Sequence, residues 1–330
     1  MKIIAIANGG FSIPTLRMLK ESKYTLSAVF IMPVRTRRSG EKAGIPPVRE
    51  AIDGFLAGTP WYEPDDINSP ESVELLKSLN ADIFFICDYG RILSKEVLLT
   101  TKHGGVNLHG SLLPKYRGAA PINRAIQNGE RELGVSVIFI EPSVDSGPIL
   151  ATASYVPSLD ETAVEVEAKL AEMGAPLVLQ TLERIEAGSF VALPQNANDA
   201  SKAPKLRKEE GRIDWTQTSA VIIDQYRAFQ PWPRVYSDWV KGSESTSAPM
   251  RIILGPFAEI DGEGNSFEPL DSSLEALPCG TIVKKTKNTF WIKTGDGALC
   301  VEAVQPAGKR NMAAEVFLRG YQLNVGDKLV

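Results

Sequence analysis

Short apolar runs alternate with amphipathic stretches through the first half of the chain. Residues 2–7 (KIIAIA) and 25–32 (TLSAVFIM) are rich in β-branched and aliphatic side chains, which favour strands, and 13–22 between them has helical spacing. The same alternation continues, predicting helices at 47–57, 69–79 and 119–128 and strands at 81–87, 105–109 and 133–140. Strands that alternate with helices of this length form a mostly parallel sheet covered on both faces, so we expect an α/β domain.

The pattern changes after residue 160. Residues 160–187 are rich in Ala, Glu and Leu and predict a long helix, bent near Gly174 and Pro176, that closes the first domain. After a polar stretch and a further helix at 216–229, short runs predict strands of a small β-barrel at 250–254, 279–285, 289–294 and 298–304. The expected division is an N-terminal domain 1–190, a basic linker 191–208 and a C-terminal domain 209–330.

Composition narrows the class of protein. The 330 residues suit two domains, and 43% hydrophobic with 23% charged residues is ordinary for a globular chain. No apolar run approaches a membrane span, and the start lacks the pattern of an export signal. Cys87, Cys279 and Cys300 are far apart and odd in number, which argues against a disulfide framework and a zinc cluster. We therefore expect a cytoplasmic protein without a metal, whose formal net charge of −4 allows nucleic-acid contact only through local patches.

The richest chemistry lies around one of the two histidines. Asn107 and His109 lie two apart on the predicted strand 105–109, so they share a face near its C-terminal end, where ligands bind in open α/β sheets. A parallel crossover would bring the end of the next strand, and Asp145 after it, to the same edge. An amide, an imidazole and a carboxylate suit acyl transfer.

Structural interpretations remain open for each of these residues. Asn107 and His109 could be a hydrogen-bonding pair, and Asp145 before Ser-Gly-Pro could be a turn residue. A covalent acyl-enzyme is poorly supported, because no G-x-S-x-G elbow is present. Gly9-Gly10 favours a tight turn over a phosphate loop.

Residues 107–121 (NLHGSLLPKYRGAAP), followed by Asp-Ser-Gly at 145–147, resemble the signature of the 10-formyltetrahydrofolate-dependent formyltransferases. The resemblance implies a Rossmann-like domain and 10-formyltetrahydrofolate as cosubstrate, with no other cofactor. It also implies that Asn107, His109 and Asp145 are catalytic. Loops 86–92 and 139–147 would hold the pterin, and the folate-binding set would be Tyr89, Gly90, Arg91, Ser111, Leu112, Leu113 and Pro114.

The second half resembles the branch of that family that formylates methionyl initiator tRNA. The matching segments are 202–215, 226–233 and 305–312, and the resemblance implies an OB-like barrel that binds tRNA. We expect a monomer with no membrane partner, and basic clusters that contact the tRNA: Arg35, Arg37, Arg38, Lys42, Lys205, Arg207 and Lys208.

Two departures and two rival functions accompany this resemblance. Asn8-Gly9-Gly10 stands where these enzymes usually carry Gly-Thr-Pro, and the loop at 33–42 keeps the basic charge but not the usual sequence. A sugar-nucleotide N-formyltransferase would share the catalytic domain, but the matched linker and C-terminal segments speak against it. A noncatalytic RNA-binding module would not need the Asn107, His109 and Asp145 set.

Overall fold

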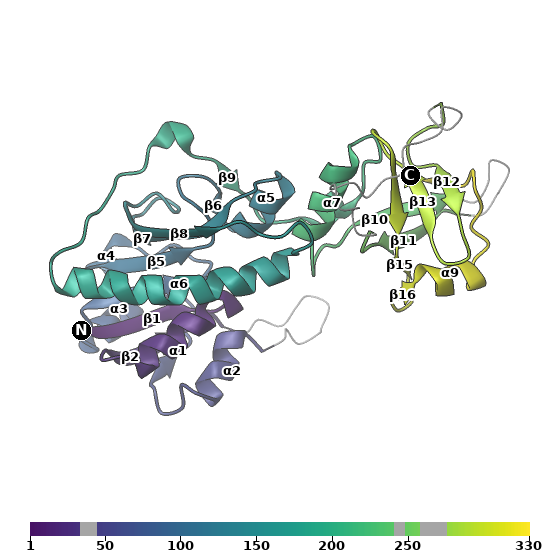
Figure 1. Cartoon of the computed structure of the whole chain (residues 1–330). Coiled ribbons are helices and arrows are strands. Elements are labelled where there is room, and N and C mark those ends of the chain that lie inside the picture. The colour runs from purple at the N-terminus through teal and green to yellow at the C-terminus, as the bar shows by residue number, and fades with distance from the viewer. Residues whose placement is uncertain (34–44, 241–247, 258–275) are drawn as a thin grey trace. The chain divides into compact units, whose positions relative to one another are not determined.

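The computed structural model describes residues 1–33, 45–240, 248–257 and 276–330 (Figure 1). The chain divides into two compact units that interleave along the sequence. Unit 1 comprises Met1–Ile122, Glu132–Pro157 and Glu165–Lys205, and unit 2 comprises Asn123–Arg131, Ser158–Val164 and Leu206–Val330. In the described part of the chain, no helix has both the length and the apolar character that a bilayer crossing requires.

A seven-stranded sheet forms the centre of unit 1, in the order β3-β2-β1-β4-β5-β7-β8. The first five of these strands run parallel, which confirms the predicted α/β class. The strands are β1 (Lys2–Ala7), β2 (Thr25–Phe30), β3 (Trp61–Tyr62), β4 (Ile83–Cys87), β5 (Gly105–His109), β7 (Leu133–Phe139) and β8 (Ile149–Tyr155). A separate small sheet pairs β6 (Arg117–Gly118) with β9 (Lys202–Ala203) in parallel.

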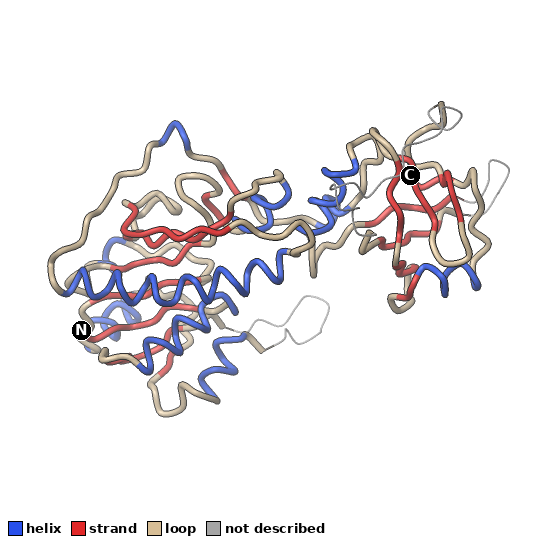
Figure 2. The backbone as a smooth tube through the Cα atoms, in the orientation of Figure 1, coloured by secondary structure: helices blue, strands red, loops and turns tan. Residues whose placement is uncertain are grey.

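The helices begin close to where the sequence predicted them. Ser69 caps α3 by accepting a hydrogen bond from the Ser72 amide, and Pro70 occupies the first turn. Helix α6 runs unbroken through Pro176, as the tube in Figure 2 shows. The helices up to this point are α1 (Ile13–Glu21), α2 (Pro47–Asp53), α3 (Pro70–Ser78), α4 (Lys95–Leu98), α5 (Pro121–Gln127) and α6 (Ala163–Glu186), with a short 3₁₀ turn η1 (Gly10–Ser12).

The far edge of the sheet differs from the prediction. Strand β7 runs antiparallel to β5, with His109 opposite Ser136 and Val106 opposite Phe139, so the predicted parallel crossover is wrong. Strand β8, antiparallel to β7, was not predicted, because Ile149–Tyr155 is half exposed and mixes Ala, Ser and Thr with few large apolar side chains. Residues 140–148 therefore join two antiparallel strands, and this loop carries Asp145.

The two faces of the sheet pack against different helices. Alternate residues such as Ile4, Ile6, Phe84 and Ile86 join the buried cluster formed with α3 and α4. On β5, Asn107 pairs with Ile86 and therefore lies on the same face as this cluster. Leu108 lies on the other face, against α6.

Unit 2 is built from antiparallel strands, which confirms the coarse prediction for the second half. One sheet has the order β16-β15-β11-β10-β17 and another the order β12-β13-β14. The predicted strand 298–304 is divided at Glu302 into two, and β10 was missed. The elements are α7 (Ser219–Ala228), β10 (Tyr236–Val240), β11 (Met250–Leu254), β12 (Ile282–Lys285), β13 (Phe290–Lys293), β14 (Ala298–Val301), β15 (Ala303–Pro306), β16 (Met312–Ala313), α9 (Ala314–Gly320) and β17 (Lys328–Leu329), with 3₁₀ turns η2 (Ala197–Asp199, in unit 1) and η3 (Lys208–Gly211).

The close approach of α6 to β5 gives a first prediction. A Cβ at Gly174 would lie 2.6 Å from Leu108 Cδ2, so Gly174→Val should lower the free energy of unfolding by about 1–3 kcal/mol, the usual cost of overpacking a core. Chemical denaturation measures this loss. Gly10→Ala is the control, because its Cβ would meet only Pro47 Cγ, at 3.8 Å. Equal unfolding free energies for the two variants would contradict the described packing.

Candidate active site

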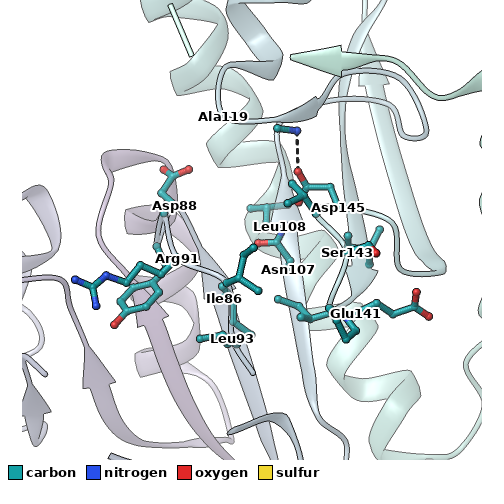
Figure 3. A pocket seen from close by; sticks show the side chains of 18 of the residues that line it. Ile86, Asp88, Arg91, Leu93, Asn107, Leu108, Ala119, Glu141, Ser143 and Asp145 are labelled. Atoms are coloured by element: carbon teal, nitrogen blue, oxygen red, sulfur yellow. Dashed lines mark hydrogen bonds between the residues drawn. The ribbon is translucent and has the colours of Figure 1, made fainter. Parts of the chain in front are cut away.

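A cavity of about 560 Å³ opens beside the C-terminal ends of β4 and β5 (Figure 3). Its walls come mainly from 88–93 after β4, Asn107 and Leu108 on β5, and 138–145 at the end of β7 and in the loop that follows. Such a volume suits a small organic ligand, and the position is the usual ligand-binding edge of an α/β sheet.

Asn107 presents its side chain to this cavity. The residue is partly exposed, and no other described group hydrogen-bonds to its side-chain amide. An amide without a protein partner at a cavity wall can donate a hydrogen bond to a ligand oxygen.

His109 is buried at the end of the same strand and is held by a carbonyl. Its Nε2 lies 2.9 Å from the Tyr116 carbonyl oxygen. Because a carbonyl can only accept, Nε2 carries a proton, which leaves Nδ1 as the nitrogen that can take up or release one. Nδ1 lies 3.6 Å from Asp145 Oδ2, so the imidazole and the carboxylate form an ion pair when the ring is protonated.

The Tyr116 carbonyl is aimed by an irregular turn. Tyr116 has a left-handed φ of 63°, and its amide donates to Ser201 Oγ over 2.9 Å. The Arg117 amide donates to the Ser201 carbonyl over 2.8 Å. Residue 201, distant in sequence, thus fixes the turn on which the His109 ring rests.

Asp145 is fixed from both its carboxylate and its backbone. The Gly118 amide donates to Asp145 Oδ2 over 2.9 Å. Gly118 has a φ of 128°, and a Cβ there would lie 2.6 Å from the Ala203 carbonyl oxygen, so only glycine suits the position. Asp145 is itself left-handed, with a φ of 49°, a conformation that Asp tolerates better than most residues.

The loop that carries Asp145 has to turn back along the sheet. Its first residue, Ile140, donates its amide to the Gly105 carbonyl at the N-terminal end of β5, whereas Asp145 reaches His109 at the other end. Gln195 holds the returning segment, because its Nε2 donates to the carbonyls of Asp145 (2.8 Å) and Gly147 (2.7 Å). Arg117 in turn donates to Gln195 Oε1. Gln195 lies in the stretch that the sequence suggested was a linker, and no sequence motif marked it.

A further ionisable group on the cavity wall was not predicted. Asp88 follows β4 and lines the cavity. The surrounding protein excludes water from its carboxylate, which raises its pKa to about 6, and repulsion by Glu167 adds a smaller increase. The residue is exposed, so solvent contact weakens this effect. Next to it, burial raises the pKa of Tyr89 to about 12, and the Tyr89 hydroxyl is buried without a hydrogen-bond partner. Asp88 has a left-handed backbone conformation at the cavity wall, which the sequence does not predict.

The predicted folate-binding residues fall into two groups. Tyr89, Gly90 and Arg91 line the cavity, and Arg91 donates to the Asp65 carbonyl. Ser111, Leu112, Leu113 and Pro114 do not line it. The Ser111 hydroxyl donates to the Lys115 carbonyl over 2.7 Å, and the Leu113 amide donates to Ser136 Oγ over 3.0 Å, so this segment is tied to its own turn and to β7. A folate contact at 111–114 stays a prediction.

The predicted tRNA-binding residues are only partly described. Arg35, Arg37, Arg38 and Lys42 lie outside the described residues. Lys205 lines the cavity, while Arg207 and Lys208 are exposed, with Arg207 Nε 3.7 Å from Glu210 Oε2. Among the residues that the structure describes, no three His, Cys, Asp or Glu side chains come together as they would around a metal ion.

Sequence comparisons place both halves of the chain. Residues 1–182 match the family model described as formyl transferase, and 205–322 match the model of the formyl transferase C-terminal domain. A methionyl-tRNA formyltransferase of Moorella thermoacetica is 35% identical over 329 residues, covering 100% of this chain and 99% of the relative. One from Rhodopirellula baltica is 34% identical over 340 residues, covering 100% and 97%.

Solved structures share the fold at lower identity. An N-formyltransferase of Helicobacter canadensis, in complex with folinic acid and dTDP-3-aminofucose, has a TM-score of 0.61 at 18% identity and covers 91% of this chain and 98% of its own. HypX from Aquifex aeolicus, in complex with tetrahydrofolic acid, has a TM-score of 0.60 at 18% identity, covering 98% of this chain and 48% of HypX.

The role of Gln195 gives a second prediction. Gln195→Ala removes both hydrogen bonds that hold the Asp145 segment, so peptides covering 141–148 should exchange amide hydrogen faster and the protein should lose about 1–3 kcal/mol of stability. Hydrogen–deuterium exchange with mass spectrometry measures the first effect and chemical denaturation the second. Gln180→Ala, at an exposed position of α6, is the control. Unchanged exchange at 141–148 would show that other contacts hold this segment.

Proposed function

Because this chain belongs to the formyl transferase family, we propose that it transfers a formyl group from 10-formyltetrahydrofolate to the amino group of methionine on initiator tRNA. The relatives that match at 34–35% identity along nearly their whole length are methionyl-tRNA formyltransferases. Both halves match, so the similarity is not confined to a catalytic domain shared with other acceptors. The observation that carries the chemistry is the His109–Asp145 pair beside a cavity that Asn107 lines.

Each of these three groups has its own role in the proposed reaction. The uncharged amine of methionine attacks the formyl carbon, and Asn107 donates a hydrogen bond to the oxyanion that forms on the formyl oxygen. His109 Nδ1 takes the proton that the nitrogen releases and returns it to the folate nitrogen as that nitrogen leaves. Asp145 stabilises the imidazolium between these transfers and orients an ordered water. Formyltetrahydrofolate is consumed as a cosubstrate, and the scheme needs no metal.

The cavity agrees with a folate cosubstrate in size and lining. The lining includes the aliphatic side chains of Ile86, Leu93 and Ile140, which suit a flat pterin ring, and the loops that carry Leu93 and Ile140 offer backbone groups for its polar edge. Folinic acid and tetrahydrofolic acid are the ligands of the two structural relatives described above.

The C-terminal half would supply tRNA binding. We assign catalysis to 1–190, the connection to the basic linker 191–208, and tRNA binding to 209–330, whose antiparallel strands we interpret as an OB-like barrel. The basic loop with Arg35, Arg37, Arg38 and Lys42 would grip the acceptor end. A monomeric state and a cytoplasmic location stay predictions.

One assay distinguishes this function from its rival. The protein is incubated with 10-formyltetrahydrofolate and either methionyl initiator tRNA or a dTDP-linked amino sugar. Formylation of the tRNA alone supports the proposal, and formylation of the amino sugar alone identifies a sugar-nucleotide N-formyltransferase. Transfer to neither acceptor would favour a noncatalytic RNA-binding module.

The catalytic assignment gives a third prediction. His109→Ala should lower turnover at least about a hundredfold, the usual scale for loss of an acid–base group, and Asn107→Ala should lose a comparable factor through the oxyanion. The dissociation constant for tetrahydrofolate should change little in either variant. His103→Ala replaces the other histidine of the chain and serves as the control. Near-normal turnover of His109→Ala and Asn107→Ala would remove the assignment.

The basic linker gives a fourth prediction. Replacing Arg207 and Lys208 together with Ala should raise the KM for charged initiator tRNA and make its salt dependence shallower, by about 0.7–0.9 in the log–log slope for each phosphate group that the variant no longer neutralises. The control double variant replaces Lys95 and Lys102, two exposed lysines of unit 1, and removes the same charge. An identical change in slope for both pairs would show a general charge effect and not a binding site.

A further inference from the structure

The Asp88 carboxylate shares the cavity with Asn107 and Asp145 but has no role in the reaction described above. Asp88 directly follows β4 and has a left-handed φ of 51°. Figure 3 shows the carboxylates of Asp88 and Asp145 at the same end of the pocket, with Leu93 and Glu141 at the other. Within the described residues, no hydrogen-bond donor or cation contacts the Asp88 carboxylate.

The turn after β1 leaves room for this carboxylate. A Cβ at Gly9 would lie 2.4 Å from Asp88 Oδ2, so any larger residue there would displace it. The turn itself is held in place, because the Met32 amide donates to Asn8 Oδ1 and the Ser12 hydroxyl donates to the Gly9 carbonyl. The glycine and the position of the carboxylate therefore depend on each other.

The charged and titratable groups around Asp88 are predominantly acidic. Glu167 on α6 and the buried Cys87 thiol interact with it electrostatically. On the cavity wall the acidic groups are Glu141 and Asp145, and Tyr89 adds a phenol. Two cations, Arg91 and Lys205, line the same cavity, but neither forms an ion pair with Asp88. A carboxylate in this setting is complementary to a cation brought by a substrate.

We propose that Asp88 binds the protonated α-amino group of the acceptor and takes the proton that this group must lose before it attacks the formyl carbon. This inference rests on the proposed function, since it assigns the acceptor's amine to the end of the pocket that Asp88 and Asp145 share. The flat pterin is left with the apolar side chains of Ile86, Leu93 and Ile140.

The proton balance is simple. The ammonium group transfers one proton to the Asp88 carboxylate and becomes a neutral amine, whose lone pair forms the new bond to the formyl carbon. Its second proton passes to His109 and then to the folate nitrogen as the old carbon–nitrogen bond breaks. Asp88 finally releases its proton to solvent, so the net reaction liberates one proton. A carboxyl group whose pKa lies above its usual range takes a proton from an amine more readily than an ordinary one does.

The pH dependence of Asp88→Asn tests the proposal. In Asp88→Asn no carboxylate can take the ammonium proton, so only acceptor molecules whose α-amino group is already neutral can react. An α-amino group of pKa about 7.7 is only a few per cent neutral near pH 6.5, so kcat/KM for methionyl initiator tRNA should fall by about tenfold or more there. Near pH 8.5 about 85% of the acceptor is neutral, so the loss should shrink to about 1.2-fold.

Two matched pairs of variants make the test specific. Asn tolerates the left-handed backbone of residue 88, so Asp88→Asn should fold normally, and Asp53→Asn in the exposed last turn of α2 is its control. Gly9→Ala pushes the carboxylate away without removing it and should reproduce the loss near pH 6.5. Gly10→Ala, whose Cβ would make only an ordinary contact with Pro47 Cγ at 3.8 Å, should not.

The outcomes separate this inference from the proposed function. If wild-type protein does not formylate methionyl-tRNA, the proposed function itself fails. If wild-type protein is active and the ratio of Asp88→Asn to wild type does not change with pH, Asp88 is not the proton acceptor. A fall in tetrahydrofolate affinity by the same factor as kcat/KM would place Asp88 on the pterin and overturn the proposal. Full activity of Gly9→Ala near pH 6.5 would also overturn it.

Discussion

Asp145 lies beside His109 because a loop reverses direction and is held where it ends. Strand β7 is antiparallel to β5, so the C-terminal end of β7 lies next to the N-terminal end of β5, away from His109. The loop has to return along β5, and hydrogen bonds from Gly118 to the carboxylate and from Gln195 to the backbone fix it there. The proposed catalytic pair therefore depends on residues from three separate segments, which explains why unit 1 includes the chain as far as Lys205.

The polar groups at the pocket fall into two kinds according to their hydrogen-bond partners. His109 and Asp145 are held by backbone groups, whereas Asn107 and Asp88 have no partner among the described residues. Leaving polar groups unpaired in a partly desolvated cavity costs free energy that a bound ligand can recover. This arrangement suits a site that is rigid in its acid–base pair and open where the substrates bind.

Much of this site could be predicted from local sequence patterns. The alternation along β5 placed Asn107 and His109 on one face, and the Ser69-Pro70 start of α3 was confirmed. The edge strand β8 and the anchoring residue Gln195 could not be predicted, because neither has a periodic pattern or a motif. Asp88 could not be predicted for a related reason, because a single carboxylate in a sequence does not indicate the turn that places it at a cavity.

The sequence by itself determined the α/β class, the order of the main helices and strands, and the residues that carry the family signature. These features follow from the spacing of side chains along the backbone, which is local. Only the tertiary structure decided the direction of β7, the return of the loop that brings Asp145 to His109, and the fit of Asp88 against Gly9. Strand direction and close packing depend on contacts between residues that are distant in sequence, and the spacing of apolar positions does not encode them.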